Sequence, residues 1–383
     1  MKCVITKSEL SILISKIQSL VANKPAIPLL SNVLIEAIDD QLILCVTDLT
    51  TSMRCYFDAK VIEEGAIALP ARRFFNLIRE LTSPQIKITS HANEIAEIVS
   101  GSSTFKIKIM NKNEFPKFPN ATGATQMPVP SNVLKNLLSR CAFSAAREDS
   151  RFVINGILLH IENQKATFMA TDGKRLAKIS SKVDIDQSFQ GYYIIPIRAV
   201  EEMVKILDDS EDIAYFSLMH DKLFLEYKNL TLVTKLLTGQ YPDIESVIPT
   251  EDLINVTLHR EELMTLLRQI ALFISETNSS IRLFFEKGQL HLNALNSEIG
   301  EGHVSMAVDY SGKNIEIAFN PYYFLDILRH IKDETVKFSM KDSYNPGVIT
   351  DSTDAFFVIM PMRISETPPP SQELNETEKP AFA

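Results

Sequence analysis

Two aspartates lie in repeated Thr-Asp pairs, Thr47-Asp48 and Thr171-Asp172. Paired carboxylates of this kind can perform acid/base or metal chemistry. The two aspartates are 124 residues apart, however, and the third corresponding region carries Asn296-Ser297 instead. Thr-Asp pairs at strand ends more often bind turn amides through their side chains. We therefore interpret both aspartates as turn residues and expect no catalytic residue.

The other residues that could do chemistry are also dispersed. The seven histidines are scattered, and the twelve glycines form no phosphate-binding loop. The four cysteines occur singly, without the close spacing of a zinc or redox site, and are Cys3, Cys45, Cys55 and Cys141. We expect reduced, buried cysteines, no metal and no cofactor.

Length and composition indicate a globular protein of two or three domains. The chain has 383 residues, of which 45% are hydrophobic, and a net charge of −9. That charge argues against nucleic-acid binding by bulk positive charge, although a local basic surface remains compatible with it. The apolar runs are too short to span a membrane and no signal peptide begins the chain, so we expect a cytoplasmic protein.

Six apolar quartets with helical spacing recur along the chain, separated by 64, 60, 66, 63 and 61 residues. Each quartet predicts a helix with one buried face, and the quartets begin at Leu10, Phe74, Leu134, Val200, Leu263 and Phe324. Further landmarks make the repeating unit a pair of helices, because Pro70-Ala71-Arg72 matches Pro196-Ile197-Arg198 at a spacing of 126 residues.

Short alternating segments between the helices indicate antiparallel sheets. The predicted class is α+β, with three similar domains of two helices on antiparallel sheets. We place the domains at residues 1–122, 128–250 and 252–364, followed by a polar, proline-rich tail at 365–383 that we expect to be disordered.

Basic residues outnumber acidic residues on the predicted helix surfaces, fourteen to eight, with Arg140 and Glu202 among them. Solvated charges alone could explain this count. Because the whole chain is acidic, the alternative is a set of helices that share one face and meet a polyanion there.

The chain resembles the bacterial beta sliding clamp family along residues 1–364. The motifs that carry the resemblance are 23–32 (NKPAIPLLSN), Thr47-Asp48-Leu49, 151–156 (RFVING), 171–176 (TDGKRL), Tyr241-Pro242-Asp243 and 358–364 (VIMPMRI). The resemblance implies a head-to-tail homodimeric ring of six domains, with helices lining a hole through which duplex DNA passes. It also implies a processivity factor that tethers the replicative DNA polymerase and is not itself an enzyme.

The resemblance implies three sets of site residues. A protein that slides needs dispersed phosphate contacts rather than base readout, and the DNA contacts would be Lys24, Arg72, Arg73, Arg151, Phe152 and Arg198. An apolar groove would bind linear motifs of the polymerase alpha subunit, the ATP-dependent clamp loader and other partners, through Ile154, Thr171, Gly173, Lys174, Arg175, Leu176, Pro242, Val247, Val358, Met360, Pro361, Met362 and Arg363. The dimer interface would contain Phe105, Ile107, Leu272 and Phe273.

Two alternatives remain open from the residues. The apolar groove residues could form an ordinary interdomain core. The chain could also be a non-catalytic, three-domain protein-binding scaffold that does not encircle DNA, in which case the basic helices are incidental.

Overall fold

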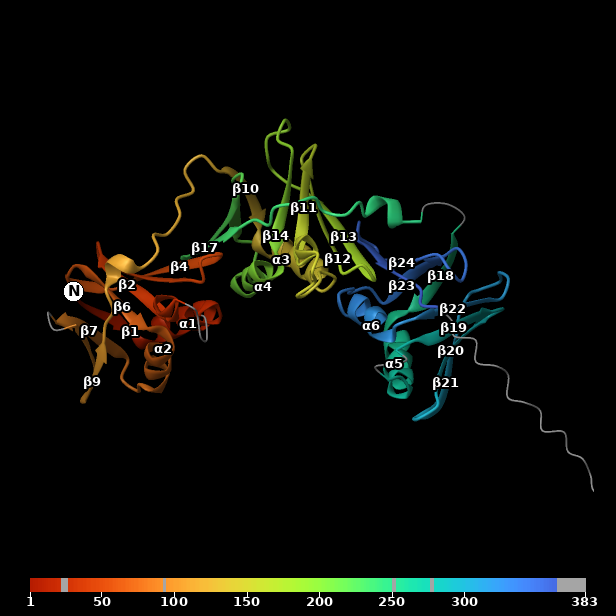
Figure 1. The fold of residues 1–383 in the computed structure, drawn as a ribbon, viewed down its shortest axis with the longest axis horizontal. Coiled ribbons are helices and arrows are strands. Elements are labelled where there is room, and N and C mark those ends of the chain that lie inside the picture. Colours follow the sequence, from red (N-terminus) through yellow and green to blue (C-terminus); the bar gives the residue numbers. More distant parts are fainter. Residues whose placement is uncertain (22–26, 92–93, 250–252, 276–278, 364–383) are drawn as a thin grey trace, which may run out of the picture. The chain divides into compact units, whose positions relative to one another are not determined.

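The computed structural model describes residues 1–21, 27–91, 94–249, 253–275 and 279–363. It divides into two compact units. The first comprises Met1–Val247 with Thr350–Val358, and the second comprises Ile248–Ile349 with the segment that begins at Ile359. The predicted class, α+β with helices on antiparallel sheets, is confirmed (Figure 1).

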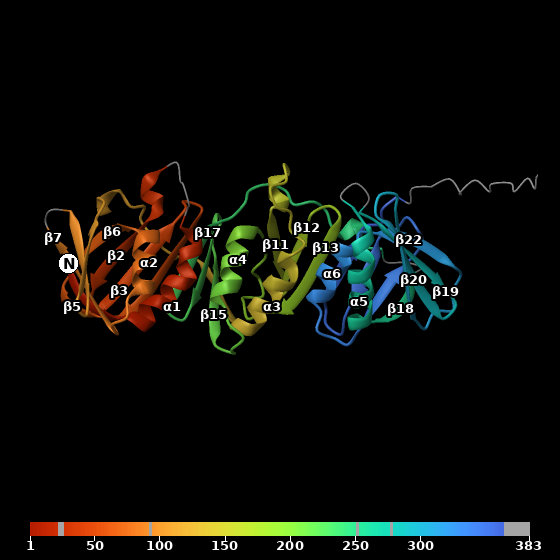
Figure 2. The same ribbon diagram turned by 90° about the horizontal axis from the view of Figure 1, so that it is seen from below.

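Four α-helices of the first unit lie on one side of its sheets, as Figure 2 shows. They are α1 (Lys7–Ile17), α2 (Ala71–Glu80), α3 (Ser131–Ala142) and α4 (Ile197–Ile206). Helix α1 packs beside α2, and α3 beside α4. Prolines precede α2, α3 and α4, where the absence of a backbone donor costs nothing.

Three antiparallel sheets form the remainder of the first unit, and their strands follow in spatial order. The first sheet is β5 (Lys60–Glu63), β1 (Lys2–Thr6), β7 (Gln85–His91), β8 (Ile95–Ser100) and β9 (Ser103–Lys108). The second is β10 (Thr125–Pro130), β15 (Ile213–Leu218), β16 (Lys222–Tyr227), β17 (Leu230–Lys235), β4 (Thr51–Asp58), β3 (Gln41–Thr47), β2 (Asn32–Ile38) and β6 (Gly65–Pro70). The third is β14 (Gly191–Pro196), β11 (Gly156–Glu162), β12 (Lys165–Thr171), β13 (Arg175–Lys182) and β25 (Phe356–Ile359).

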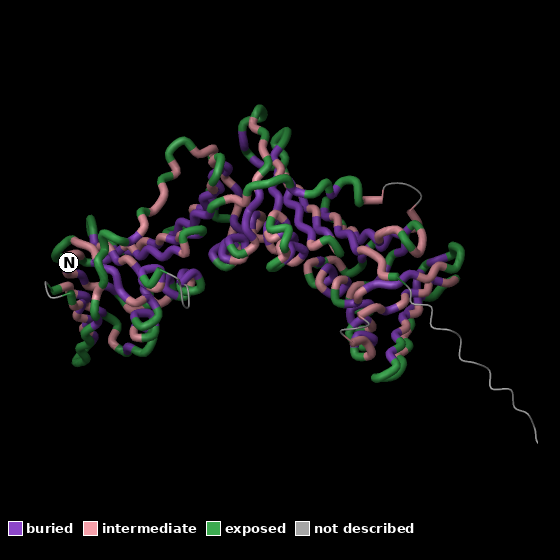
Figure 3. Tube along the Cα trace, viewed as in Figure 1, coloured by how far each residue is buried: buried purple, intermediate pink, exposed green. Residues whose placement is uncertain are grey.

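The second of these sheets joins two repeats. Strand β17 pairs with β4 in antiparallel register, with Leu232 opposite Met53, so residues almost 180 positions apart share one ladder. Both side chains are fully buried. Burial alternates along β4 and the helices bury the face turned to the strands, which places the cores between helices and sheets (Figure 3).

The second unit repeats this plan with α5 (Arg260–Ile270) packed beside α6 (Pro321–Arg329). Its strands, in spatial order, are β21 (Gly300–Ala307), β20 (Gln289–Asn296), β19 (Ile281–Glu286) and β22 (Ile315–Phe319), and separately β24 (Gly347–Thr350), β23 (Thr335–Met340) and β18 (Ile254–His259). Phe319, Phe324 and Phe338 pack together in its core, with ring centroids 5.2–6.1 Å apart. Short 3-10 helices in the chain are η1 (Gln18–Leu20), η2 (Pro28–Ser31), η3 (Lys112–Glu114), η4 (Phe152–Ile154), η5 (Glu245–Val247) and η6 (Ala271–Phe273).

Each apolar quartet begins inside one of the six described α-helices, and all four cysteines are buried as predicted. Two charged residues were wrongly assigned to the exposed helix surface. Arg140 is 7% exposed and Glu202 is 4% exposed. Both sit at the edge of a buried helix face, where partners in the fold replace water. The predicted tail at 365–383 lies outside the described residues.

Candidate functional site

The first turn of α2 presents two arginines to solvent. Phe74, Phe75 and Ile78 bury the opposite face of this helix, so Arg72 and Arg73 necessarily point outward. Neither arginine forms an ion pair with another described residue. A helix N-terminus also carries partial positive charge, and the two arginines therefore suit a phosphate backbone. Lys24, a further candidate DNA contact, lies outside the described residues.

Arg198 occupies the corresponding turn of α4 but already has a partner. Its Nη1 lies 3.2 Å from Oδ2 of Asp48, which belongs to the turn between β3 and β4. The other carboxylate oxygen, Oδ1, accepts the backbone N–H groups of Thr50 at 3.0 Å and Thr51 at 2.7 Å. Asp48 therefore holds its own turn and links it to the next repeat, and its interpretation as a turn residue is confirmed.

Arg151 is similarly engaged, by Asp149. The guanidinium donates from Nε to Oδ1 at 3.0 Å and from Nη2 to Oδ2 at 2.9 Å. These hydrogen bonds lower the pKa of the Asp149 carboxyl to about 2, so the pair is charged at neutral pH. Phe152, the adjacent candidate, is 55% exposed.

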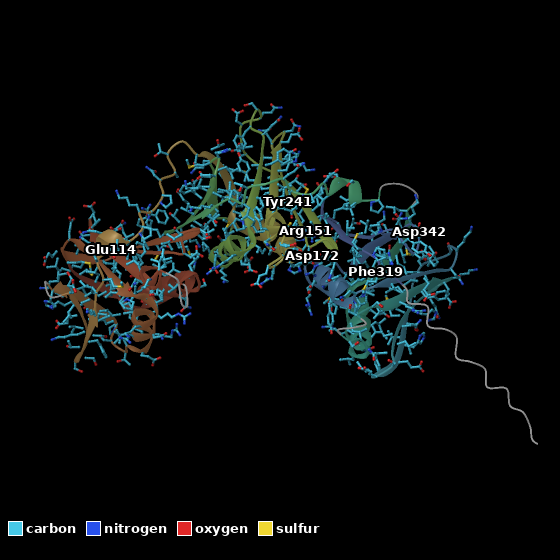
Figure 4. All side chains as sticks on the ribbon, viewed as in Figure 1. Glu114, Arg151, Asp172, Tyr241, Phe319 and Asp342 are labelled. Atoms are coloured by element: carbon cyan, nitrogen blue, oxygen red, sulfur yellow. The ribbon has the colours of Figure 1, made fainter. Side chains whose placement is uncertain are left out.

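The turn at 171–176 is built around Asp172, with Arg151 beside it (Figure 4). Oδ1 of Asp172 accepts the N–H groups of Lys174 at 2.9 Å and Arg175 at 3.0 Å, while Oδ2 accepts from Arg175 Nε at 3.1 Å. Gly173 has φ of +84°, which an L side chain rarely adopts. The turn is therefore held rigidly at the point where β13 begins, and Asp172 is confirmed as a turn residue.

The predicted groove residues of the first unit differ in exposure. Ile154, Leu176 and Val358 are at most 3% exposed, so they belong to the buried core of the first unit. The exposed members are Gly173, Lys174, Pro242 and Val247, whereas Thr171 is buried and Arg175 is half-buried. Among the groove candidates of this unit, Pro242 and Val247 therefore provide the accessible apolar surface.

The remaining groove candidates belong to the second unit. Met360, Pro361 and Met362 are half-buried and Arg363 is exposed. The Met362 backbone N–H donates to the Ala318 carbonyl oxygen at 2.8 Å, which anchors this short segment beside β22.

A buried ion pair near the groove was not anticipated from the sequence. Arg140 on α3 pairs with Asp351, whose side chain is 2% exposed, and donates from Nη1 to the Thr353 hydroxyl at 3.1 Å. Its guanidinium carbon also lies 5.5 Å from the ring centroid of Phe357. Arg140 therefore anchors the segment that leads into β25 and Val358. One feature of the sequence could have indicated the burial of Arg140: it lies three residues after Leu137, at the edge of the apolar face of α3.

The four candidate interface residues are exposed to different extents. Strand β9 is an edge strand, on which Phe105 is 37% exposed while Ile107 is only 6% exposed. Leu272 is 74% exposed, and Phe273 is half-buried against Gly302. Phe105 and Leu272 therefore offer most of the accessible apolar surface among the four.

The sequence matches three family models in succession. These are the N-terminal domain of the DNA polymerase III beta subunit over residues 1–119, its central domain over 128–243 and its C-terminal domain over 245–363. This chain belongs to the DNA polymerase III beta subunit family. The beta sliding clamp of Chlamydia pneumoniae is 50% identical over 366 residues, which cover 96% of this chain and 100% of that relative.

Solved structures agree with this family membership. The DNA polymerase III subunit beta of Pseudomonas aeruginosa matches with a TM-score of 0.91 and 28% identity, over 95% of this chain and 100% of that one. A P. aeruginosa sliding clamp bound to griselimycin matches with a TM-score of 0.91 and 29% identity, again over 95% and 100%. Among the residues described in this chain, no helix is long and apolar enough to cross a membrane.

Proposed function

We propose that this chain is a DNA sliding clamp that encircles duplex DNA and tethers the replicative polymerase during chromosomal replication. The observation that carries the proposal is the succession of three clamp-family domains along residues 1–363. The exposed arginines on α2 support it, because a sliding protein needs sequence-independent phosphate contacts. A closed ring remains on DNA by topology, so these contacts can be individually weak.

The proposed ring contains two chains in head-to-tail contact, each with domains at 1–122, 128–250 and 252–364. Strand β9 has an unpaired edge and alternating lysines, which discourage indiscriminate pairing and favour one specific partner. Exposed Leu272 of the second chain would cover Phe105 of the first. Two identical contacts of this kind close the ring.

The proposed partners are duplex DNA, the polymerase alpha subunit, an ATP-dependent loader and other proteins that carry the same linear motif. The proposed groove has exposed Pro242 and Val247 on the first unit, and half-buried Met360 and Met362 on the second. Methionine side chains adapt to different apolar anchors, which suits a groove with several ligands. The proposed role is non-catalytic and cytoplasmic, and it requires no cofactor.

Retention on circular and linear DNA tests the main proposal. The chain would be loaded with a clamp loader and ATP onto nicked circular DNA, and one half of the sample would then be linearised. We expect the protein to remain on circles in high salt and to leave linear DNA by sliding off the ends. Equal loss from both forms would favour a scaffold that does not encircle DNA.

A peptide titration tests the groove separately. A motif peptide with micromolar affinity has only about 8 kcal/mol of binding free energy, and a few anchors supply most of it. The variant Met360→Ala with Met362→Ala should therefore bind a polymerase-derived peptide at least about tenfold more weakly. Met219→Ala, a half-buried methionine elsewhere, is the control. Unchanged affinity in the double variant would place the groove elsewhere.

A further inference from the structure

A cavity of about 420 Å³ lies in the first unit, beneath the connection from β9 to β10. Its floor contains one row of paired strands, in which Cys45 of β3 lies opposite both Leu34 of β2 and Arg54 of β4. Phe115 and Phe118 of the connection also line the cavity and pack in one apolar cluster with Cys45. We name this cavity the linker pocket, and these five residues define it.

Arg54 is held in position without being neutralised. Its guanidinium carbon lies 4.9 Å from the ring centroid of Tyr56 and 4.5 Å from that of Phe118. Within the part of the chain that the structure describes, its buried Nε has no hydrogen-bond partner and Arg54 forms no ion pair. The two aromatic rings therefore orient a guanidinium whose charge remains available to a ligand.

Two exposed lysines of the connection add to this positive charge. Lys112 and Lys117 line the linker pocket, and neither forms an ion pair with another described residue. Among the residues that line the pocket, Glu36 is the one carboxylate. Three cations therefore face a single carboxylate, and this excess of positive charge favours an acidic ligand.

The second repeat contains the same row of strands with a different charge balance. Strands β11, β12 and β13 lie 124 residues after β2, β3 and β4 and pair in the same register, so Lys178 takes the place of Arg54. A cavity of about 810 Å³ lies beneath the connection that follows. Glu245 lines this cavity and pairs with Lys178. The second repeat therefore supplies its own carboxylate to the cation.

The first repeat lacks that carboxylate. The two connections correspond at a spacing of 126 residues, because Phe115-Pro116 matches Tyr241-Pro242. Pro119 therefore stands at the position of Glu245. Since Glu245 shows that this position can deliver an acid to the cation, the linker pocket is a site of the same design in which the acid must come from a ligand.

We propose that the linker pocket binds an acidic linear peptide of a partner protein. One carboxylate of the peptide would pair with Arg54, since a guanidinium binds a carboxylate through two parallel hydrogen bonds. Neighbouring acidic side chains would contact Lys112 and Lys117, and an apolar side chain would cover the half-buried Leu34 and Phe118. All of these residues belong to the first unit, and the binding does not depend on DNA encirclement.

A tryptophan-containing peptide tests this binding directly, because the chain itself has no tryptophan. The probe is a synthetic peptide with one tryptophan flanked on each side by two glutamates. We expect a saturable shift of its fluorescence to shorter wavelength as the indole enters the pocket. Peptides with glutamine for glutamate, or with alanine for tryptophan, should compete at least about tenfold less well. No saturation, or equal competition by either altered peptide, would overturn the proposal.

Substitutions at two positions test the role of the unpaired arginine. Arg54→Met removes the charge but keeps an apolar side chain between the rings, and should weaken probe binding at least about tenfold. Pro119→Glu copies the acid of the second repeat and should cause a similar loss by pairing with Arg54. Pro119→Gln is the matched uncharged control and should bind the probe normally. Equal affinity of the two Pro119 variants, each with an unchanged circular dichroism spectrum, would overturn the assignment.

Two further variants locate the probe on the surface. Lys112→Gln with Lys117→Gln should weaken probe binding about fivefold, since each exposed ion pair contributes modestly. Lys165→Gln with Lys182→Gln removes the same charge from another exposed site and should have little effect. If these two lysine variants bound the probe equally, the assigned contacts would be wrong.

The groove variant Met360→Ala with Met362→Ala separates this site from the proposed polymerase groove. It should bind the probe as tightly as the unchanged chain does. Weaker binding in this variant would place the probe in the groove and overturn a second peptide site.

Discussion

One residue position performs the same backbone task in each of the three repeats. Oδ1 of Asp48, Asp172 and Asn296 accepts two backbone N–H groups of the following turn. The remaining side-chain atom differs in its partner. Oδ2 of Asp48 pairs with Arg198 of the next repeat, and Oδ2 of Asp172 pairs with nearby Arg175. In Asn296 the amide nitrogen donates to the Ser275 hydroxyl at 2.9 Å. A shared turn residue thus supports different connections.

Asp149 controls whether Arg151 can contact a phosphate, which leads to a first prediction. Its low pKa means that the stabilisation from the ion pair is complete above pH 3.8, the ordinary carboxyl value, and that the pair itself breaks only as the pH falls through about 2. Asp149→Asn keeps the Oδ1 acceptor for the Arg151 backbone but removes the competing charge. We expect a two- to threefold higher DNA affinity, and a salt dependence of binding that is steeper by about one phosphate contact.

The control for this prediction combines Asp149→Asn with Arg151→Ala. The double variant should lose the gain, because the freed guanidinium is the group that would meet the DNA. If Asp149→Asn alone left the salt dependence unchanged, Arg151 would not face the duplex.

The buried cysteines give a second prediction. Burial raises the pKa of Cys3 to about 11 and those of Cys45 and Cys55 to about 12, from an ordinary value of 9.0. The unfolded thiols therefore ionise first, so folding stability falls as the pH rises above 9. At pH 8 the folded thiols should react with iodoacetamide roughly a hundredfold more slowly than in urea, because the thiolate is the nucleophile. Mass spectrometry measures both rates, and similar rates would contradict the burial.

At the scale of elements, the sequence predicts the helices well and the sheet order poorly. The apolar quartets locate all six described helices, and prolines such as Pro70 and Pro196 mark where two of them begin. Alternation within β4 predicts which side chains are buried, but it contains no information about the neighbouring strand. The pairing of β17 with β4 is a contact between repeats, and it depends on how complete domains dock.

The edge strand β9 and the exposed Leu272 of η6 support a third prediction. In the proposed ring, Leu272→Ala with Phe273→Ala should give monomers. Each side chain of this size contributes about 1.5–3 kcal/mol when fully buried. Sedimentation at low micromolar concentration measures the change. As a control, the variant Ile299→Ala changes another exposed apolar residue and should remain dimeric. If the Leu272/Phe273 double variant also remained dimeric, the proposed interface would be refuted.

The Arg140–Asp351 pair gives a fourth prediction, on the stability of the segment that leads to β25. Both side chains are at most 8% exposed. Arg140→Ala leaves a buried, unpaired carboxylate and should lower the free energy of unfolding by about 3–5 kcal/mol. Arg140→Met with Asp351→Leu replaces both charges by apolar groups and should recover most of this loss. Urea unfolding compares the variants, and a loss in the double variant as large as in Arg140→Ala would contradict the explanation.

For the whole molecule, a count of charged residues overestimates the positive surface available to DNA. The sequence shows which helices are basic, but it cannot show that Arg140 is buried, that Arg198 pairs with Asp48 or that Arg151 pairs with Asp149. The partners of Arg140 and Arg198 come from distant turns, so their identity depends on tertiary packing, whereas Asp149 lies two residues from Arg151 in the same loop. The exposed pair Arg72 and Arg73 was predictable from the helix period alone, because Phe74, Phe75 and Ile78 define the buried face.

The last prediction concerns the basic surface of the complete ring. Changing Lys24, Arg72 and Arg198 to alanine should weaken DNA contact equally for all sequences, and each lost phosphate contact should reduce the salt-dependence slope by about 0.9. Because Asp48 already engages Arg198, Arg72→Ala alone should have a larger effect than Arg198→Ala alone. Peptide binding should be unchanged in every variant. The control variant, Lys165→Gln with Lys182→Gln, removes charge from another exposed site. If the triple variant and this control showed the same salt dependence, other residues would face the duplex.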